Sequence, residues 1–311
     1  MKRLMMIYNP RSSCYGRVSE EVLPKARGLK GWMVGKYEVA DTDVDDNAAR
    51  LAKLLQDGDL VVVVGGDGTA TIAMNAVLLS RCKDVVFGVL GNGNFNDMAR
   101  TFGTGDFDEM LEIVEGGGKG RIAEVWPLEC LVNGEHWRWG MCYFTVGLFA
   151  EACAVFDEKE NRRELRTGRK GLLYSVGLLA KWYFANRKKV RLGDFELVRG
   201  GKRLKCVGRT DYVAINGRSM AKMMRGGEWF LDKHEFRGET RSLRGFWGLM
   251  RLMAVSILGR VPGVETGGDV LEFERPSSVM VQGEGEYKRF ENVGKIEVRK
   301  SRVSVRVIMG K

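Results

Sequence analysis

The chain has 311 residues, of which 44% are apolar, and a formal net charge of +10. This length allows two domains, and this apolar content excludes a largely disordered chain. The longest apolar stretch, residues 171–180, is too short to span a bilayer. The run at residues 4–8 is too short for a signal peptide and ends at Asn9-Pro10, so we expect it to be a first strand.

Residues 1–124 alternate short apolar runs with segments of helical spacing, which predicts a parallel sheet covered on both faces. Gly or Asn-Pro follows each predicted strand, as expected where a strand ends in a loop. Thr69 is the predicted N-cap of the second helix. Strands are expected at 4–8, 60–64 and 85–90, and helices at 18–26 and 69–79.

Residues 125–311 have a different texture, with short strand-like runs separated by turn signals such as Asn133-Gly134 and Asn216-Gly217. Two helical stretches, roughly 169–187 and 240–258, interrupt them. The sequence therefore predicts an N-terminal α/β domain at 1–124 and a C-terminal, β-sandwich-like domain at 125–311, whose last strands can contact the first domain. Strands are expected at 125–132, 137–146, 189–198, 205–215, 269–273, 279–282, 296–298 and 303–308.

The cysteines and histidines exclude several classes of site. None of the six cysteines forms a C-x-x-C pair, which favours reduced thiols in a cytosol over a disulfide framework. Two histidines are too few for a His-rich metal site. The chain has no G-x-S-x-G motif, which argues against a serine hydrolase of that type.

The most informative loop is Gly65-Gly66-Asp67-Gly68-Thr69, which follows a predicted strand. Paired glycines let backbone N–H groups approach a phosphate closely, and the next helix adds the positive end of its dipole. Asp67 would repel phosphate unless it engages a cation or a substrate proton. A tight turn with a surface aspartate is the alternative interpretation.

Four motifs together resemble the superfamily of diacylglycerol, sphingosine and bacterial lipid kinases and NAD kinases. The glycine loop is similar to its G-G-D-G-T signature. Asn9-Pro10-Arg11-Ser12 resembles the N-P-x-S-G motif that opens the lipid kinases, and residues 93–100 resemble their G-T-x-N-D-F-A-R motif. Residues 281–286 resemble V-Q-x-D-G-E, with Glu286 at the position of the glutamate and Glu284 at that of the aspartate.

The resemblance implies an ATP-dependent lipid kinase that needs Mg²⁺. Catalysis falls to Asp67 and Glu286, with Glu286 the better match for the base and Asp67 the competing choice. Asp67, Asp97 and Glu124 are the candidates for placing Mg²⁺, which prefers oxygen ligands. The expected ATP contacts are Asn9, Pro10, Ser12, Gly65, Gly66, Gly68, Thr69, Gly93, Asn94 and Asn96. Asn9, Ser12, Asn94 and Asn96 can equally be turn formers that satisfy their own backbones, and Glu284 and Glu286 can be a solvated turn.

Several positions depart from the family pattern. Ser13 and Asn94 replace a glycine and a threonine, and Ile72 takes the place of a glutamate. Glu284 replaces the aspartate of D-G-E, and residues 220–225 replace a glycine-rich run. These changes bear on the lipid substrate more than on ATP.

The positive charge gathers in one stretch. Residues 1–124 hold 15 Lys and Arg against 18 Asp and Glu, whereas residues 159–205 hold 15 against 4. Cations beside Leu, Tyr, Trp and Phe suit an anionic membrane surface. We therefore expect a cytoplasmic protein bound peripherally to membranes, with no nucleic-acid partner, and a homodimer is compatible with the sequence. Core-facing helices with solvated cationic flanks are the alternative.

Two other functions compete with a lipid kinase. An NAD kinase shares G-G-D-G but acts on a soluble nucleotide, and the Asn9-Pro10 and Asn96-Asp97 motifs argue against it. A degenerate family member would bind nucleotide or lipid without catalysis. Ile72 favours that alternative, and the retention of Asp67, Asp97 and Glu286 opposes it.

Overall fold

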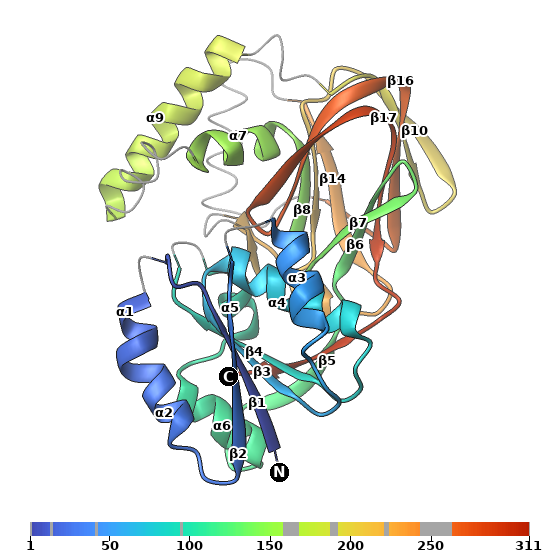
Figure 1. Cartoon of the computed structure of the whole chain (residues 1–311). Coiled ribbons are helices and arrows are strands. Elements are labelled where there is room, and N and C mark those ends of the chain that lie inside the picture. The colour runs from blue at the N-terminus through green and yellow to red at the C-terminus, as the bar shows by residue number, and fades with distance from the viewer. Residues whose placement is uncertain are drawn as a thin grey trace.

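A computed structural model describes residues 2–12, 15–40, 43–93, 96–157, 168–186, 192–220, 224–242 and 263–310. Its strands form two large sheets that lie one above the other in Figure 1. The chain enters the lower sheet first, builds the upper one, and returns to the lower sheet with its last strand. This return places the C-terminal strand in the middle of the N-terminal part of the fold (Figure 1).

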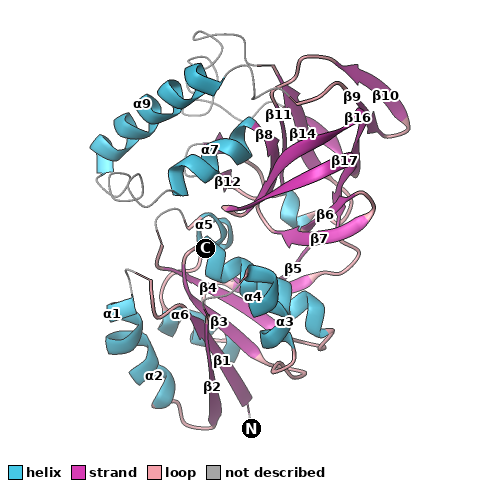
Figure 2. Ribbon diagram, turned by 45° about the horizontal axis from the view of Figure 1, so that its top comes forward, coloured by secondary structure: helices cyan, strands magenta, loops and turns pink. Residues whose placement is uncertain are grey.

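The lower sheet has six strands in the order β2-β1-β3-β4-β18-β5. All neighbours are parallel except β18 and β5. The β-branched run of β3 is buried along its whole length, as expected for a strand covered on both faces (Figure 2). The strands are β1 Lys2–Tyr8, β2 Trp32–Glu38, β3 Leu60–Gly65, β4 Val86–Gly91, β5 Arg121–Val125 and β18 Val305–Met309.

Helices cover this sheet on both faces. One face packs against the N-terminal helical segment and α6, and the other against α3, α4 and α5. The N-terminal segment includes a π-helical part, Val18–Val22, between α1 and α2. The helices are α1 Tyr15–Arg17, α2 Leu23–Arg27, α3 Val44–Ala52, α4 Asp67–Ser80, α5 Asp97–Phe102 and α6 Phe107–Glu115.

The upper sheet has ten antiparallel strands, with β16 and β17 as its longest pair. Helices α7 Leu148–Asp157 and α9 Gly168–Asn186 lie to one side of it (Figure 1), and η2 Trp229–Leu231 is a short 3-10 helix. Its strands are β6 Leu128–Val132, β7 Glu135–Gly140, β8 Tyr143–Gly147, β9 Phe195–Arg199, β10 Lys202–Cys206, β11 Asp211–Ile215, β14 Phe236–Arg241, β15 Val264–Thr266, β16 Gly268–Gly283 and β17 Glu286–Lys300. The short strands β12 Ser219–Met220 and β13 Met224–Arg225 pair separately.

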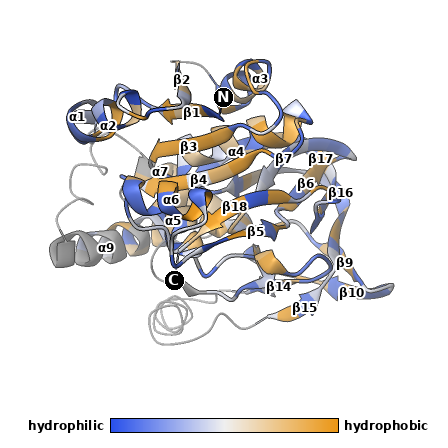
Figure 3. Ribbon diagram, turned by 90° about the horizontal axis from the view of Figure 1, so that it is seen from below, coloured by the Kyte–Doolittle hydropathy of each residue, from blue (hydrophilic) through white to orange (hydrophobic). Residues whose placement is uncertain are grey.

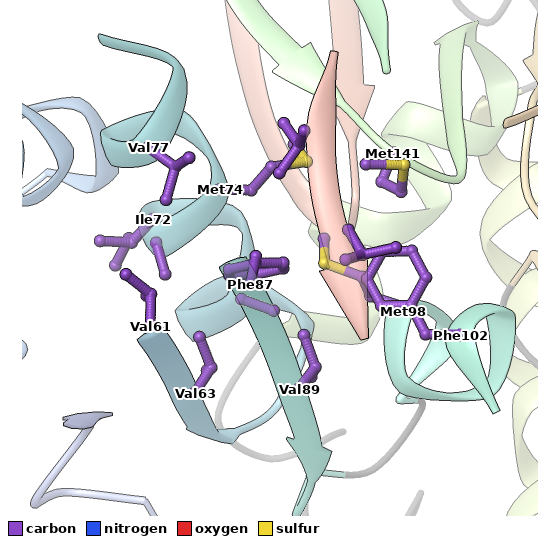
Figure 4. Close-up of a cluster of buried hydrophobic side chains, with 14 of the residues drawn as sticks. Val61, Val63, Ile72, Met74, Val77, Phe87, Val89, Met98, Phe102 and Met141 are labelled. Atoms are coloured by element: carbon purple, nitrogen blue, oxygen red, sulfur yellow. The ribbon is translucent and has the colours of Figure 1, made fainter. Parts of the chain in front are cut away.

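One hydrophobic cluster joins the two sheets. Val61, Val63 and Phe87 of the lower sheet pack in the same cluster as Met141 of the upper part (Figure 4). Figure 3 shows the apolar residues concentrated along β3 and β4, where this packing occurs. Because buried apolar area stabilises at roughly 25 cal/mol per Å², a shared cluster resists separation of the two parts. Loops of the two sheets therefore meet in a defined geometry.

The predicted fold class is confirmed: a helix-covered, mainly parallel sheet is followed by a large antiparallel sheet. One local prediction is wrong, because the helix expected to begin at Thr69 begins at Asp67 and has Gly66 as its N-cap. The sequence patterns did not predict the strands β2, β12, β13, β14 and β15. The predicted division near residue 124 stays a prediction, and β18 pairs with β4 and β5.

The predicted helix at 169–187 is present as α9. Residues 243–258 of the second predicted helix, together with residues 159–167 and 187–191 of the basic stretch, lie outside the described residues. Within the described part of the chain, none of the helices combines the length and apolar character required to cross a bilayer.

Candidate functional site

The glycine loop forms a tight connection between β3 and α4. Strand β3 ends at Gly65, Gly66 caps the helix in an extended conformation, and α4 begins at Asp67. The neighbouring loop after β4 approaches so closely that a Cβ on Gly93 would lie 2.5 Å from the Gly66 Cα. Only glycine fits there. The backbone N–H groups at the start of α4 are thus available at a helix N-terminus, the usual place for a phosphate.

The loop after β4 is shaped by the Asn96 side chain. Its Oδ1 accepts a hydrogen bond from Gly93 N at 2.7 Å, and its Nδ2 donates to Gly93 O at 2.8 Å. Asn96 adopts a left-handed backbone with φ of 54°, which asparagine tolerates better than most residues. The turn-forming interpretation therefore describes what Asn96 does in this structure. Asn94 lies outside the described residues.

Asp67 links the two loops. Its Oδ1 accepts a hydrogen bond from Met98 N at 3.1 Å, in the first turn of α5. Burial and, after it, the Asp97 carboxylate raise the pKa of Asp67, and backbone hydrogen bonds from Met98 and Asp97 oppose them, so that the pKa is about 6. Asp97 is itself buried and forms an ion pair with Arg100. Two carboxylates thus share the junction of the two loops.

A turn of the upper sheet brings further carboxylates to this junction. Strands β16 and β17 are joined by Glu284 and Gly285, both with positive φ (57° and 86°), as in a type I′ hairpin. Just after the turn, Glu286 extends over the glycine loop. A Cβ built on Gly68 would lie 2.5 Å from the Glu286 Oε1. The structure therefore brings Glu286 together with the loop that contains Asp67, more than 200 residues away in sequence.

Glu284 is completely buried. Its Oε1 accepts hydrogen bonds from the N–H groups of Cys142 and, at 3.2 Å, Tyr143. Its Oε2 has no hydrogen-bond partner among the described residues. Burial raises the pKa of Glu284 to about 8; the two backbone hydrogen bonds lower it, and the charges of Asp67 and Asp97 raise it. The solvated-turn interpretation is wrong for Glu284, because the turn is packed against β8.

The loop after β1 lies at the same edge of the sheet as the glycine loop, since β1 and β3 are parallel neighbours. Asn9 Oδ1 accepts a hydrogen bond from Arg11 N at 2.9 Å, and Asn9 O accepts one from Ser12 N at 3.0 Å. Asn9 thus closes its own turn around Pro10. The Thr69 side chain is buried against Gly65, where a Cβ would meet it at 3.0 Å.

Glu124 is not brought to the other candidates. It lies exposed on β5, and its partner Arg306 pairs with Val86, the first residue of β4. The glycine loop is at the opposite, carboxyl end of β3 and β4. Within the described ranges, no three His, Cys, Asp or Glu side chains are grouped closely enough to hold a metal ion by themselves. Mg²⁺ normally takes one or two carboxylates together with substrate phosphates, which suits Asp67 and Asp97.

Sequence analysis missed two polar residues behind the site, Asn216 and Lys300, which are 0% and 7% exposed. In the sequence Asn216 stands out as half of an Asn-Gly turn signal, and nothing there indicates that its side chain is buried. A lysine that follows an alternating strand pattern gives no sequence signal of burial, because long-range packing decides it.

Comparison with known proteins gives a consistent family. Residues 3–125 match the family model of the diacylglycerol kinase catalytic domain. The crystal structure of a diacylglycerol kinase from Bacillus anthracis strain Sterne superimposes with a TM-score of 0.67 at 15% identity, covering 99% of this chain and 97% of that one. A structure of a candidate diacylglycerol kinase from the same organism gives 0.67 at 14% identity with the same coverage. No protein of curated function is significantly similar in sequence.

Proposed function

We propose that this chain, whose residues 3–125 belong to the diacylglycerol kinase catalytic domain family, is a lipid kinase that transfers the γ-phosphate of ATP to the hydroxyl of a diacylglycerol-like membrane lipid. One observation carries the proposal. The β16–β17 turn sets Glu286 against the loop of Asp67 and buries Glu284 within reach of the charges of Asp67 and Asp97, so that acidic groups from both sheets meet near a helix N-terminus.

The first side of the site suits a triphosphate and its metal. Phosphoryl transfer depends mainly on positioning and on neutralising charge. The N-terminus of α4 would hold phosphate oxygens, and Asp67 and Asp97 would hold Mg²⁺. Bound Mg²⁺ would supply the positive charge that neutralises the phosphates. Burial and then the neighbouring Asp97 carboxylate raise the pKa of Asp67, and a bound cation would offset both effects.

The second side of the site suits proton removal from the acceptor hydroxyl. Glu286 stays a proposed catalytic residue, because it contacts the glycine loop. We add Glu284 as the preferred base, since one of its carboxylate oxygens has no partner in the described chain and its pKa of about 8 is close to the operating pH. Coupled carboxylates titrate as a group, so the pH profile of turnover would report Asp67 and Glu284 together.

The acceptor is proposed to be a lipid because the lipid-kinase motifs and the basic, aromatic stretch occur in the same chain. Of the described α9 side chains, Tyr174 and Phe184 are 37% and 41% exposed, and Lys181 is exposed. Aromatic rings beside a cation are typical of a surface that meets the headgroup region of a bilayer.

The deciding experiment incubates the protein with radiolabelled ATP, Mg²⁺ and mixed-lipid vesicles, and separately with NAD. We expect the label in an organic-soluble phospholipid and none on NAD. Chelation of divalent ions should abolish the transfer, and added Mg²⁺ should restore it. Label on NAD would favour the NAD kinase alternative. Binding of ATP without transfer to any lipid or to NAD would favour a degenerate, non-catalytic member.

A further inference from the structure

A buried network holds the chain segment that carries the partners of Glu284. Oε1 of that residue accepts hydrogen bonds from the N–H groups of Cys142 and Tyr143. The carbonyls beside these amides are held by Asn216, whose Nδ2 donates to Met141 O at 2.8 Å and whose backbone N–H donates to Cys142 O at 2.7 Å. Asn216 therefore fixes the orientation of the peptide groups that donate to the carboxylate.

Lys300 in turn fixes the side-chain amide of Asn216. Its Nζ donates to Asn216 Oδ1 at 2.6 Å, to Trp229 O at 2.5 Å and to Trp126 O at 3.3 Å. Burial lowers the pKa of Lys300 to about 7, and in its ammonium form the side chain has donors only, which selects the oxygen end of the amide. The amide nitrogen must then face the carbonyls of Met141 and Trp126, to which it donates. In the opposite amide orientation, the Asn216 Nδ2 donor would face the Lys300 Nζ donor.

The network lies where the chain passes between the two sheets. Trp126 stands between β5 and β6, and Lys300 is the last residue of β17, before the chain returns to β18. Ser301 N donates a hydrogen bond to Pro127 O at 2.8 Å, which links the two segments where the chain passes from one sheet to the other. The orientation of the peptides around Cys142 is thus coupled to the junction between the sheets.

We propose that Asn216 and Lys300 are positioning residues, which hold the 141–143 segment so that its amides orient the Glu284 carboxylate toward the glycine loop. The catalytic consequence rests on the proposed kinase function, whereas the positioning itself is a property of the fold. Neither residue touches the reacting groups. A residue that only stabilises the fold would act independently of Glu284, and a positioning residue acts through it.

The first test reads the geometry without any activity. Lys300→Met removes all three donors and keeps an unbranched side chain of similar length, and Lys295→Met is the matched control, on the same strand but 43% exposed. We expect the amides of Cys142 and Tyr143 to exchange their hydrogens about tenfold faster in Lys300→Met, a change of roughly 1.4 kcal/mol in local opening. The control should match the parent.

A second variant keeps the test decisive if Lys300→Met does not fold. Lys300→Gln keeps donors for Asn216 but loses the reach of the ammonium, so we expect an intermediate rate of exchange at the same two amides. Parental exchange at these amides in the folded Lys300 variants would overturn the inference.

The second test is a double-mutant cycle on lipid phosphorylation. Lys300→Met should lower kcat about tenfold and leave the KM for ATP within about twofold, and it should cause no further loss in a Glu284→Gln background. Additive losses would show that Lys300 acts independently of Glu284 and would overturn the inference. If the parent phosphorylates no lipid, the proposed function fails, and the exchange measurement still decides whether Lys300 positions the segment.

Discussion

The two sides of the site satisfy their polar groups differently. On the lower side, Asn9 and Asn96 hydrogen-bond the backbones of their own loops, and Asp67 accepts from the first turn of α5. On the upper side, Glu284 is fully buried with one carboxylate oxygen unpartnered among the described residues. The lower side is built from local turns that stabilise themselves. The upper side carries a group whose burial costs stability, which is common where a group is kept for chemistry.

The sharpest test of this comparison is Glu284→Gln. The glutamine oxygen can still accept from Cys142 and Tyr143, so the turn should stay folded while the base is lost. We expect turnover to fall about 10³-fold, within the range for loss of a general base. Glu291→Gln, an exposed position on β17 a short way after the turn, is the matched control.

Comparison of Glu286→Gln with Glu284→Gln decides which of the two glutamates is the catalytic base. If Glu284→Gln retains near-parental turnover and Glu286→Gln does not, the base is Glu286. Glu284 is then a buried structural carboxylate, and its unpartnered oxygen on the upper side of the site has no role in catalysis.

Asp67→Asn should have the next largest effect. An asparagine oxygen can still accept from Met98 N, so the link between the two loops survives and the negative charge does not. We expect a loss of turnover of about 10²-fold, typical of removing one electrostatic contact at a reacting phosphate, with a higher Mg²⁺ concentration for half-maximal rate. Asp46→Asn, exposed on α3, should match the parent in both measurements.

The sequence predicted the lower side far better than the upper. Its loops follow strands directly and their motifs are contiguous, so Gly65, Asp67 and Asp97 were found together. The burial of Glu284 depends on the pairing of β16 with β8, a contact between positions about 140 residues apart. Glu124 was predicted to lie in the site, and the sequence could not show otherwise. Only the antiparallel pairing of β5 with β18 places it at the opposite end of the sheet from the glycine loop. Local patterns predict turns, and long-range pairing decides which turns meet.

A buried carboxylate away from the site separates the effect of burial from that of function. Asp211 is fully buried with neither oxygen partnered in the described chain, and burial raises its pKa from 3.8 to about 7. The folded state therefore holds a proton between pH 4 and 7 that the unfolded state has lost. Its stabilising contribution is fully present below pH 4 and declines as the pH rises through 7.

Asp211→Asn should remove this dependence. We expect the variant to exceed the parent at pH 8 by about 2 kcal/mol in the free energy of unfolding, and to equal it near pH 4. Urea denaturation across this pH range measures the difference. Turnover should stay parental, in contrast to Glu284→Gln, which should also gain stability at pH 8 but lose activity. Equal stability of Asp211→Asn and the parent at all pH values would contradict the argument.

The last prediction concerns the membrane, and it is measured as vesicle binding rather than as turnover. We predict binding to anionic vesicles and not to neutral ones, weakened by salt as the Debye length shrinks. Cations near an anionic surface contribute about 1 kcal/mol each, so replacing Arg187, Lys188 and Lys189 by Glu should weaken vesicle binding strongly at low salt.

Phe184→Ala on α9 removes one exposed ring and should weaken vesicle binding only a few-fold. Met33→Ala, a similarly exposed side chain on β2, is the control. ATP binding belongs to the lower side of the site and should be unaffected in all three. If the triple variant sediments with anionic vesicles as well as the parent does, the basic stretch is not the docking surface, and the acceptor must reach Glu284 and Glu286 without it.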